Sequence, residues 1–169
     1  MQDDSRDALR DTIRRLARPQ TPAAATGILR LACLYDDDGA LGDAARSIGL
    51  DVVYVHQSGD DWPAEGDDLS VYGHAPPFDL LCACLPEGAQ VEAFTLALRF
   101  LRVRRPAAFL LLGADFAGGL TERILAQAKQ LTYQSGVHVR DSQAVIVGTL
   151  DDDDVVESAL WQVAEKATQ

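Results

Sequence analysis

A chain of 169 residues, of which 47% are hydrophobic, is long enough to form one soluble domain with a sizeable buried core. Its net charge of −11 argues against autonomous DNA binding, because contacts to phosphates depend on lysine and arginine. The sequence has no run of about 18 apolar residues, and its N-terminus lacks the apolar stretch of a secretory signal. We therefore expect a cytoplasmic protein without a membrane-spanning segment.

The predicted elements begin with an amphipathic helix over residues 4–17, which Pro19 ends. Residues 1–26 are accordingly interpreted as an N-terminal helix and linker. From residue 27 onward, segments typical of strands alternate with segments typical of helices, which predicts a single domain over 27–169. Three apolar side chains of the first helix have the spacing of one helix face. They are Leu9, Ile13 and Leu16.

Apolar runs and their boundaries give the remaining elements. The predicted strands cover 28–34, 51–55, 78–84, 107–112, 137–139 and 144–147. The predicted helices cover 40–48, 89–103, 120–133 and 153–167. Residues 58–77 are rich in glycine, aspartate and proline and are predicted to be a loop, with a short strand over 70–72 as an option. The last two strands are close enough in sequence to form a hairpin.

Three of the predicted strands are apolar throughout, which is typical of strands buried on both faces. The expected fold is therefore an α/β fold of three layers (αβα) with a mostly parallel, doubly wound sheet of the Rossmann-like type. Ligands of such folds bind beyond the carboxyl ends of the strands. The candidate loops there are 35–40, 57–61, 85–89 and 112–118.

The cysteines and histidines do not predict a metal site. Cys33, Cys82 and Cys84 lie inside apolar runs and form no CxxC pair, so they are interpreted as buried reduced thiols. The three histidines are scattered along the sequence and are predicted to be surface or loop residues.

Several stretches, in matching order and spacing, resemble the cytosine-5 DNA methyltransferases. They are residues 31–35 (LACLY) with the following helix and residues 51–54 (DVVY), residues 65–67 (EGD), residues 78–86 (FDLLCACLP), residues 97–111 (ALRFLRVRRPAAFLL) and residues 144–148 (AVIVG). The resemblance covers residues 27–148 and implies an S-adenosylmethionine-dependent methyltransferase fold. The family's target-recognition region is missing, because Gly148 runs almost directly into the last predicted helix. Another doubly wound fold, receiver-like or hydrolase-like, is the alternative.

The resemblance also implies where the catalytic residues of the family would stand. That family places its nucleophilic cysteine directly after the proline that matches Pro86, and its thiolate attacks C6 of cytosine. Here Glu87 occupies that position, and Cys84 lies before the proline, where it is interpreted as a thiol of the strand. The glutamate with which the family holds the flipped base falls at Leu112. The family's pair of arginines falls at Asp141 and Gln143.

The implied cofactor site is altered as well. The family's glycine loop brings bare backbone to S-adenosylmethionine, but one of its glycines is here Asp37 and only Gly39 remains. The acidic residue expected on the ribose falls at Gln57, and Asp67 matches the family's aspartate beside the adenine. No cofactor is therefore expected, or only weak binding of S-adenosylmethionine. The remnant pocket would consist of Tyr35, Asp37, Gly39, Gln57, Asp67 and Pro86.

These losses concern different parts of the sequence but one implied pocket. They predict a catalytically inactive methyltransferase-like domain that acts as a regulatory or scaffolding partner of a DNA-modifying protein, such as an active DNA methyltransferase. One alternative is a subunit of a split, active cytosine-5 methyltransferase whose missing parts are on another chain. Others are a ligand sensor that uses the remnant pocket and an acidic decoy for a DNA-binding protein. A homodimer is also compatible with the sequence.

Overall fold

The computed structural model describes residues 3–16, 30–35, 39–56, 78–114, 119–140 and 143–150. The elements in chain order are α1 (Asp3–Leu16), β1 (Arg30–Leu34), α2 (Ala40–Ser47), β2 (Asp51–His56), β3 (Leu80–Leu85), α3 (Gln90–Arg104), β4 (Ala108–Ala114), α4 (Leu120–Gln130), β5 (Gln134–Arg140) and β6 (Gln143–Thr149). The helix predicted over 153–167 and the optional strand over 70–72 lie outside these residues. None of the described helices has the length and apolar character needed to cross a bilayer.

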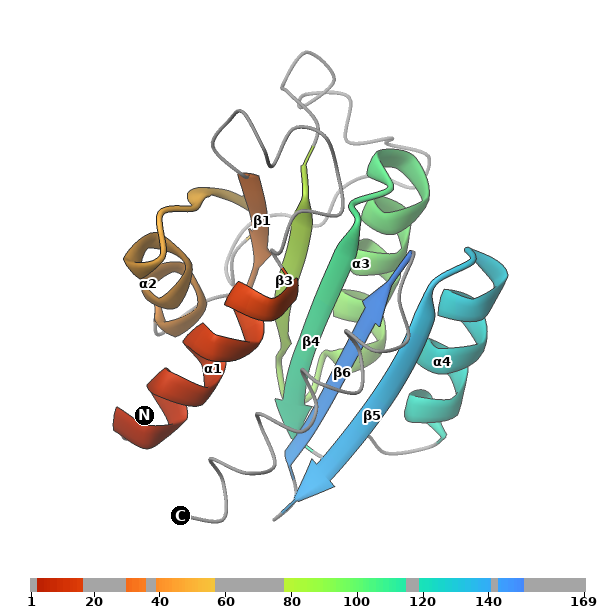
Figure 1. The fold of residues 1–169 in the computed structure, drawn as a ribbon. Coiled ribbons are helices and arrows are strands. Elements are labelled where there is room, and N and C mark those ends of the chain that lie inside the picture. Colours follow the sequence, from red (N-terminus) through yellow and green to blue (C-terminus); the bar gives the residue numbers. More distant parts are fainter. Residues whose placement is uncertain are drawn as a thin grey trace.

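The strands form one six-stranded sheet in the order β2-β1-β3-β4-β6-β5 (Figure 1). The first four are parallel to one another, whereas β6 is antiparallel to both β4 and β5. Strand β5 therefore runs in the same direction as β4, and only β6 runs against the rest. The predicted mostly parallel sheet is confirmed, and the last two strands form the predicted hairpin.

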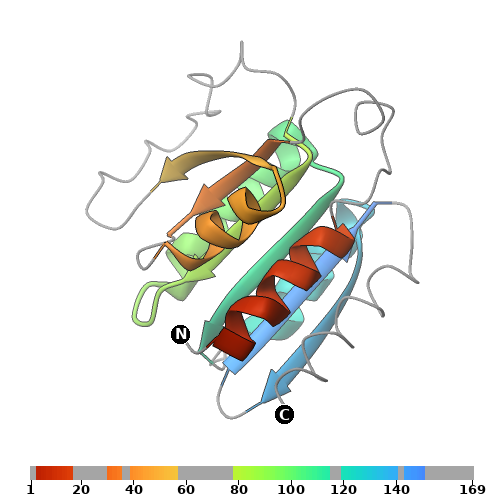
Figure 2. The same ribbon diagram turned by 60° about the vertical axis from the view of Figure 1, so that its left-hand side comes forward.

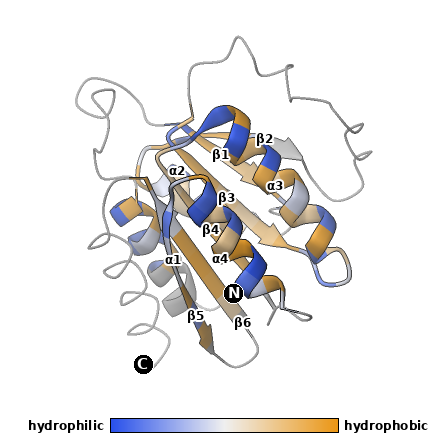
Figure 3. Cartoon of the chain, turned by 90° about the vertical axis from the view of Figure 1, so that its right-hand side faces the viewer, coloured by the Kyte–Doolittle hydropathy of each residue, from blue (hydrophilic) through white to orange (hydrophobic). Residues whose placement is uncertain are grey.

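Helices cover both faces of the sheet, with α1 and α2 on one face and α3 and α4 on the other (Figures 1 and 2). Each face has its own core. Phe100, Phe109 and Ile146 belong to the core beneath α3 and α4, and Ile13 and Leu110 belong to the core beneath α1 and α2. The central strands β3 and β4 are largely hydrophobic along their length, whereas β5 at the edge is more polar (Figure 3). The predicted three-layer α/β architecture is thus the observed one.

Strand β3 shows why an apolar run in the sequence correctly predicted a strand buried between two helix layers. Its sequence is LLCACL, and all of its residues but Cys84 are buried. Leu81 and Ala83 contribute to the α3 side, whereas Leu80 and Cys82 contribute to the α1 side. Successive side chains of a strand point to opposite faces, so a strand covered on both faces needs apolar residues at every position.

Helix α1 packs on the same face of the sheet as α2. The predicted apolar face is confirmed, because Leu9, Ile13 and Leu16 are all buried in the core that also contains Leu41 of α2. Thr12 is fully buried as well. The N-terminal helix is therefore part of the packed domain, and its burial of apolar surface is the main reason that it stays folded.

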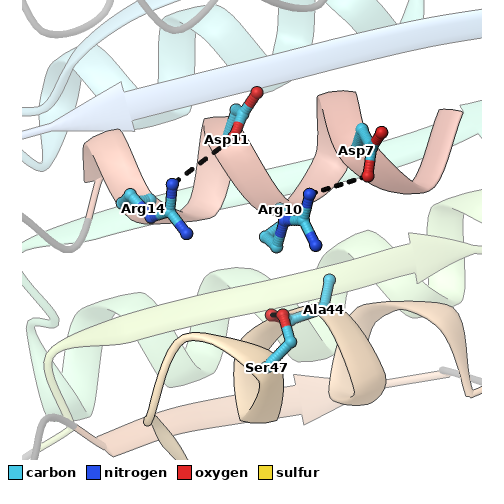
Figure 4. A network of polar contacts seen from close by, with 6 residues as sticks. All are labelled: Asp7, Arg10, Asp11, Arg14, Ala44 and Ser47. Carbon is cyan, nitrogen blue, oxygen red and sulfur yellow. Dashed lines mark hydrogen bonds and ion pairs between the residues drawn. The ribbon is translucent and has the colours of Figure 1, made fainter. Parts of the chain in front are cut away.

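The polar contacts of α1 and α2 that Figure 4 draws are local ones. On α1, Arg10 pairs with Asp7 at 2.7 Å and Arg14 pairs with Asp11 at 3.7 Å, one turn apart in each case. On α2, the hydroxyl of Ser47 donates to the carbonyl of the residue three positions earlier at 2.6 Å. Exposed pairs of this kind contribute only about 0.2–0.5 kcal/mol each. They support the two helices but do not decide where the helices pack.

Asp79 ties together the starts of three parallel strands. Its backbone N–H donates to the carbonyl of Arg30 at 2.8 Å, and its Oδ2 accepts the N–H of Arg30 at 2.9 Å. Its own carbonyl accepts the N–H of Ala108 at 3.3 Å. One residue of the segment before β3 therefore fixes the register of β1 and β4 on either side.

We expect Asp79→Ala to lower the free energy of unfolding by about 1–2 kcal/mol, because the N–H of Arg30 loses its acceptor in a partly buried place. Urea denaturation followed by circular dichroism measures this change. Asp79→Asn keeps an acceptor oxygen and is the control, with a smaller expected loss. Equal stability of the alanine variant and the unmodified protein would contradict the role given to this carboxylate.

Candidate functional site

The connections of the sheet change direction between β1 and β3. From β1 the chain crosses to β2 on one side, whereas β3 and then β4 lie on the other side. In doubly wound sheets such a switch point opens a crevice at the carboxyl ends of the strands, and ligands bind there. This edge is the one toward which the arrowheads of β4 and β5 point in Figure 1. It is the candidate functional site.

The turn from β1 into α2 forms one wall of the site. Tyr35 follows β1 directly, is buried, and has a φ of 57°, which is unusual for a residue other than glycine. Gly39 caps α2 with a φ of 75° and offers no side chain to the first helical N–H groups. Gly39 thus presents main chain without a side chain at the switch point. Asp37 lies outside the described residues.

The turn from β3 into α3 forms the floor of the site and is short. The N–H of Ala89 donates to the carbonyl of Pro86 at 3.1 Å, and Gly88 has a φ of 87°. A glycine with positive φ at the third position is the signature of a type II β-turn. Glu87 is the second residue of this turn and is exposed, whereas Pro86 is half-buried. The predicted catalytic position is thus the solvent-facing apex of a tight turn.

The cysteines lie on the sheet and not on this turn. Cys33 and Cys82 are register partners on neighbouring strands, and both are fully buried thiols that form no disulfide, as predicted. Cys84 forms no disulfide either but is only half-buried, and packs at the margin of both cores. The prediction of a buried thiol is wrong in degree for Cys84, because this residue is one position from the end of β3.

Strand β4 ends beside the same turn. Leu112 is half-buried and is the register partner of Cys84 on one side and Val145 on the other. Gln143 starts β6 opposite the last residue of β4, which places it at the carboxyl edge as well. All predicted site positions within the described residues lie at this edge: Tyr35, Gly39, Pro86, Glu87, Leu112 and Gln143. Gln57, Asp67 and Asp141 lie outside the described residues.

Sequence reasoning missed the type II turn and its Gly88, although the spacing Pro-x-Gly was a usable signal. It also did not anticipate the left-handed conformation of Tyr35, for which the sequence carries no signal. Glu87 shares this edge with other charged residues, among them Asp43 in the first turn of α2 and Arg140 at the end of β5. The described part of the chain contains no group of three or more histidine, cysteine or carboxylate side chains suited to a metal ion.

S-adenosylmethionine fits the described residues through backbone rather than side chains. Gly39 at the start of α2 and Gly88 in the compact turn after β3 place bare main chain at the switch point, as a nucleoside ligand needs. The carboxylate in the first turn of α2 belongs to Asp43, which pairs with Arg46 of the same helix at 3.6 Å. The described residues are therefore compatible with such a ligand but favour weak rather than tight binding.

No protein-family model matches the sequence, and no curated protein shows significant similarity to it. Solved structures do match. A protein-(glutamine-N5) methyltransferase from Alicyclobacillus acidocaldarius has a TM-score of 0.56 at 10% identity, covering 90% of this chain and 95% of that one. The T. thermophilus 16S rRNA N2 G1207 methyltransferase, solved with S-adenosylmethionine and guanosine, has a TM-score of 0.54 at 18% identity, covering 89% and 40%.

A candidate DNA modification methyltransferase encoded within an E. coli prophage has a TM-score of 0.53 at 13% identity, covering 72% of this chain and 46% of that one. The chain thus spans less than half the length of the prophage and rRNA proteins. At such identities the likeness shows the fold alone. The described chain has the Rossmann-like α/β fold of the S-adenosylmethionine-dependent methyltransferases.

Proposed function

We propose that this chain is a relative of the cytosine-5 DNA methyltransferases that does not methylate cytosine itself. It acts instead as a regulatory or scaffolding partner of a DNA-modifying protein. The observation that carries the proposal is the turn after β3, where the exposed carboxylate of Glu87 follows Pro86 directly. The resemblance of residues 78–86 to the strand and loop of that family supports the comparison.

The chemistry of cytosine methylation explains why this substitution matters. A thiolate must add to C6 of the ring before C5 can accept a methyl group. A carboxylate is a much poorer nucleophile for this addition. Cys84 does not replace the missing thiol, because it lies three residues earlier within β3. Sliding β3 by an odd number of residues would exchange its two faces and turn each core-facing side chain the wrong way.

Two further positions at the edge support an inactive site. Leu112 stands where the family uses a glutamate, and its half-buried hydrocarbon side chain accepts no hydrogen bond from a flipped base. Gln143 stands where the family uses an arginine, so a positive charge that would attract DNA phosphate is absent at the start of β6. Together with the net charge of −11, these residues favour contact with a protein rather than with DNA.

A ligand sensor is the second candidate, and the start of α2 is the observation that favours it. Gly39 presents bare main chain at the switch point, which lets a ligand approach the backbone closely. Isothermal calorimetry with S-adenosylmethionine separates the two proposals. Binding that Gly39→Val abolishes would favour the sensor, and no heat of binding would favour a purely structural role.

We expect the purified chain to transfer no methyl group from tritiated S-adenosylmethionine to cytosine-containing duplex DNA. We also expect no covalent adduct with a duplex that contains 5-fluorocytosine, which traps the thiolate addition. Cys84→Ser should behave like the unmodified protein in both assays. Methyl transfer by the unmodified chain, or an adduct that Cys84→Ser abolishes, would contradict the proposal and identify Cys84 as the nucleophile.

The partner role needs a separate measurement. The chain is mixed with cytosine-5 DNA methyltransferases from the same organism, and the methylation rate and the co-elution of the two proteins are measured. A changed rate together with co-elution supports the regulatory role. Activity that arises only in the mixture, and that needs this chain, would favour the split-enzyme alternative. An unchanged rate without co-elution would contradict both.

A further inference from the structure

We infer that an arginine cluster on the outer side of α3 and α4 is a docking surface for an acidic segment of a partner protein. The cluster consists of Arg99 and Arg102 of α3, Arg105 at the C-terminal cap of that helix, and Arg123 of α4. Because α3 leads into β4, this end of the helix lies at the amino ends of the parallel strands, away from the candidate functional site. The inference therefore goes beyond the proposed function and holds whether or not the chain methylates DNA.

The spacing of the arginines brings them together along the boundary between the two helices. Arg99, Arg102 and Arg105 follow one another at intervals of three residues, so they lie on one side of α3 in successive turns. The guanidinium of Arg102 reaches α4, where its Nη2 donates to Oε1 of Gln127 at 3.4 Å. Arg123 lies one turn before Gln127 and is therefore on the side of α4 that faces α3.

None of the four arginines has a carboxylate partner among the described residues. The described ion pairs lie instead on α1, on α2 and between β1 and β2: Arg10–Asp7, Arg14–Asp11, Arg46–Asp43 and Arg30–Asp51. Like charges one turn apart destabilise a helix. In a chain with 26 acidic side chains, four neighbouring arginines without a carboxylate therefore favour a role in binding an anionic group from outside.

Arg99 gives a second and independent indication of an external acceptor. The residue is half-buried, and its Nη2 is shielded from solvent without a hydrogen-bond partner. A charged donor that has lost its water and has no acceptor raises the free energy of the folded state. A carboxylate that approaches the partly exposed guanidinium can supply this acceptor once the side chain rotates.

An acidic protein segment fits this surface better than a nucleic acid does. Carboxylates match the planar fork of arginine with two parallel hydrogen bonds. Val103 is 48% exposed one turn after Arg99 and offers an apolar contact to a protein side chain. Glu92 and Glu122 lie in the first turns of the two helices and limit the positive surface to its C-terminal half. A phosphate backbone, charged at every nucleotide, would extend past the cluster toward these carboxylates.

The experiment titrates the full chain into a fluorescein-labelled peptide in which glutamates alternate with serines and leucines, and follows fluorescence anisotropy. Arg99→Gln/Arg102→Gln removes two charges from the cluster. Arg10→Gln/Arg14→Gln removes the same number of charges from α1 and is the matched control. We expect the cluster variant to bind about tenfold more weakly or worse, because it loses hydrogen bonds between charged groups. The control should bind like the unmodified chain, and added salt should weaken binding.

Arg99→Lys/Arg102→Lys keeps both charges but lacks the planar fork, so we expect it to lose part of the affinity. The inference is overturned if the unmodified chain does not bind the peptide, or if the cluster and control variants lose equal affinity. Tighter binding of single-stranded DNA through the same arginines, or self-association of the chain through them, would also overturn it. If replacing the four aspartates of residues 151–154 by asparagine creates binding that the unmodified chain lacks, the arginines pair with the chain's own aspartates instead.

Discussion

Replacement of Gly148 by alanine is expected to lower the free energy of unfolding by about 2–3 kcal/mol, because β6 has no room for a side chain there. A Cβ at this position would lie 2.3 Å and 2.5 Å from Cε1 and Cζ of Phe109. The ring of Phe109 is fully buried and packs edge-on against Tyr133 at a centroid distance of 5.2 Å. The ring therefore cannot move aside to make room for the added methyl group. Urea denaturation measures the loss.

A double-mutant cycle separates this contact from other effects of the alanine. Phe109→Leu shortens the side chain opposite Gly148 and is destabilising by itself, since it leaves part of the core unfilled. In that background Gly148→Ala should cost much less than in the unmodified protein. If the alanine costs the same in both backgrounds, contact with the ring is not the reason for the glycine.

Tyr133→Phe is expected to lower the free energy of unfolding by about 1–3 kcal/mol at neutral pH. The hydroxyl of Tyr133 donates to the carbonyl of Pro106 at 2.7 Å in a buried place, and phenylalanine would leave that carbonyl without a donor. Tyr54→Phe is the matched control, because its hydroxyl accepts an exposed hydrogen bond from Arg46 at 3.3 Å. A loss no larger than that of Tyr54→Phe would contradict the expectation.

The same residue should make stability fall at high pH. Burial raises the pKa of Tyr133 from 10.0 to about 12, and the nearby charge of Arg105 lowers it by a smaller amount. Between these values the unfolded chain loses the phenolic proton while the folded chain keeps it. The stabilisation is therefore complete below pH 10 and decreases as the pH rises to 12, by up to about 2–3 kcal/mol.

This pH dependence is measured as the difference between the unmodified protein and Tyr133→Phe, because other groups titrate equally in both. We expect the two unfolding free energies to converge as the pH rises from 10 to 12. Parallel curves over this interval would show that burial of Tyr133 does not disfavour the ionised form.

The strands were predictable wherever burial on both faces imposed an apolar sequence, as in β3 and β4. Strand β5 was predicted only over 137–139, whereas it extends from Gln134 to Arg140. Its first residues, Gln134, Ser135 and Gly136, carry no strand signal. They are part of the strand because β6 offers them hydrogen-bond partners, and pairing of this kind depends on tertiary context.

Contacts between distant residues were beyond sequence reasoning. Arg105 ends α3 and donates to the carbonyl of Leu131 and, at 2.9 Å, to the hydroxyl of Thr132. Its guanidinium also lies 5.2 Å from the centroid of the Tyr133 ring. These partners follow α4, so no local sequence pattern around Arg105 predicts the contact. His138, predicted to be a surface or loop residue, is half-buried in β5, within the strand predicted over 137–139.

The location of the candidate site was predicted from the sequence, but its backbone conformation was not. Topology alone places the loops after β1, β3 and β4 at one edge, so Glu87 and Leu112 were expected near each other. The type II turn that exposes Glu87 had a sequence signal in Gly88 that was missed, whereas the left-handed backbone of Tyr35 had none. The roles given to these residues stay predictions.

The place of β6 between β4 and β5 has a consequence for the order of events during synthesis. The four parallel strands emerge from the ribosome before β5 and can assemble as they emerge. Strand β5 has no position beside β4, because β6 occupies that place in the finished sheet. Strand β5 can therefore join the sheet only after β6, the last described strand, has been translated. Until then β5 lacks its hydrogen-bonded neighbour.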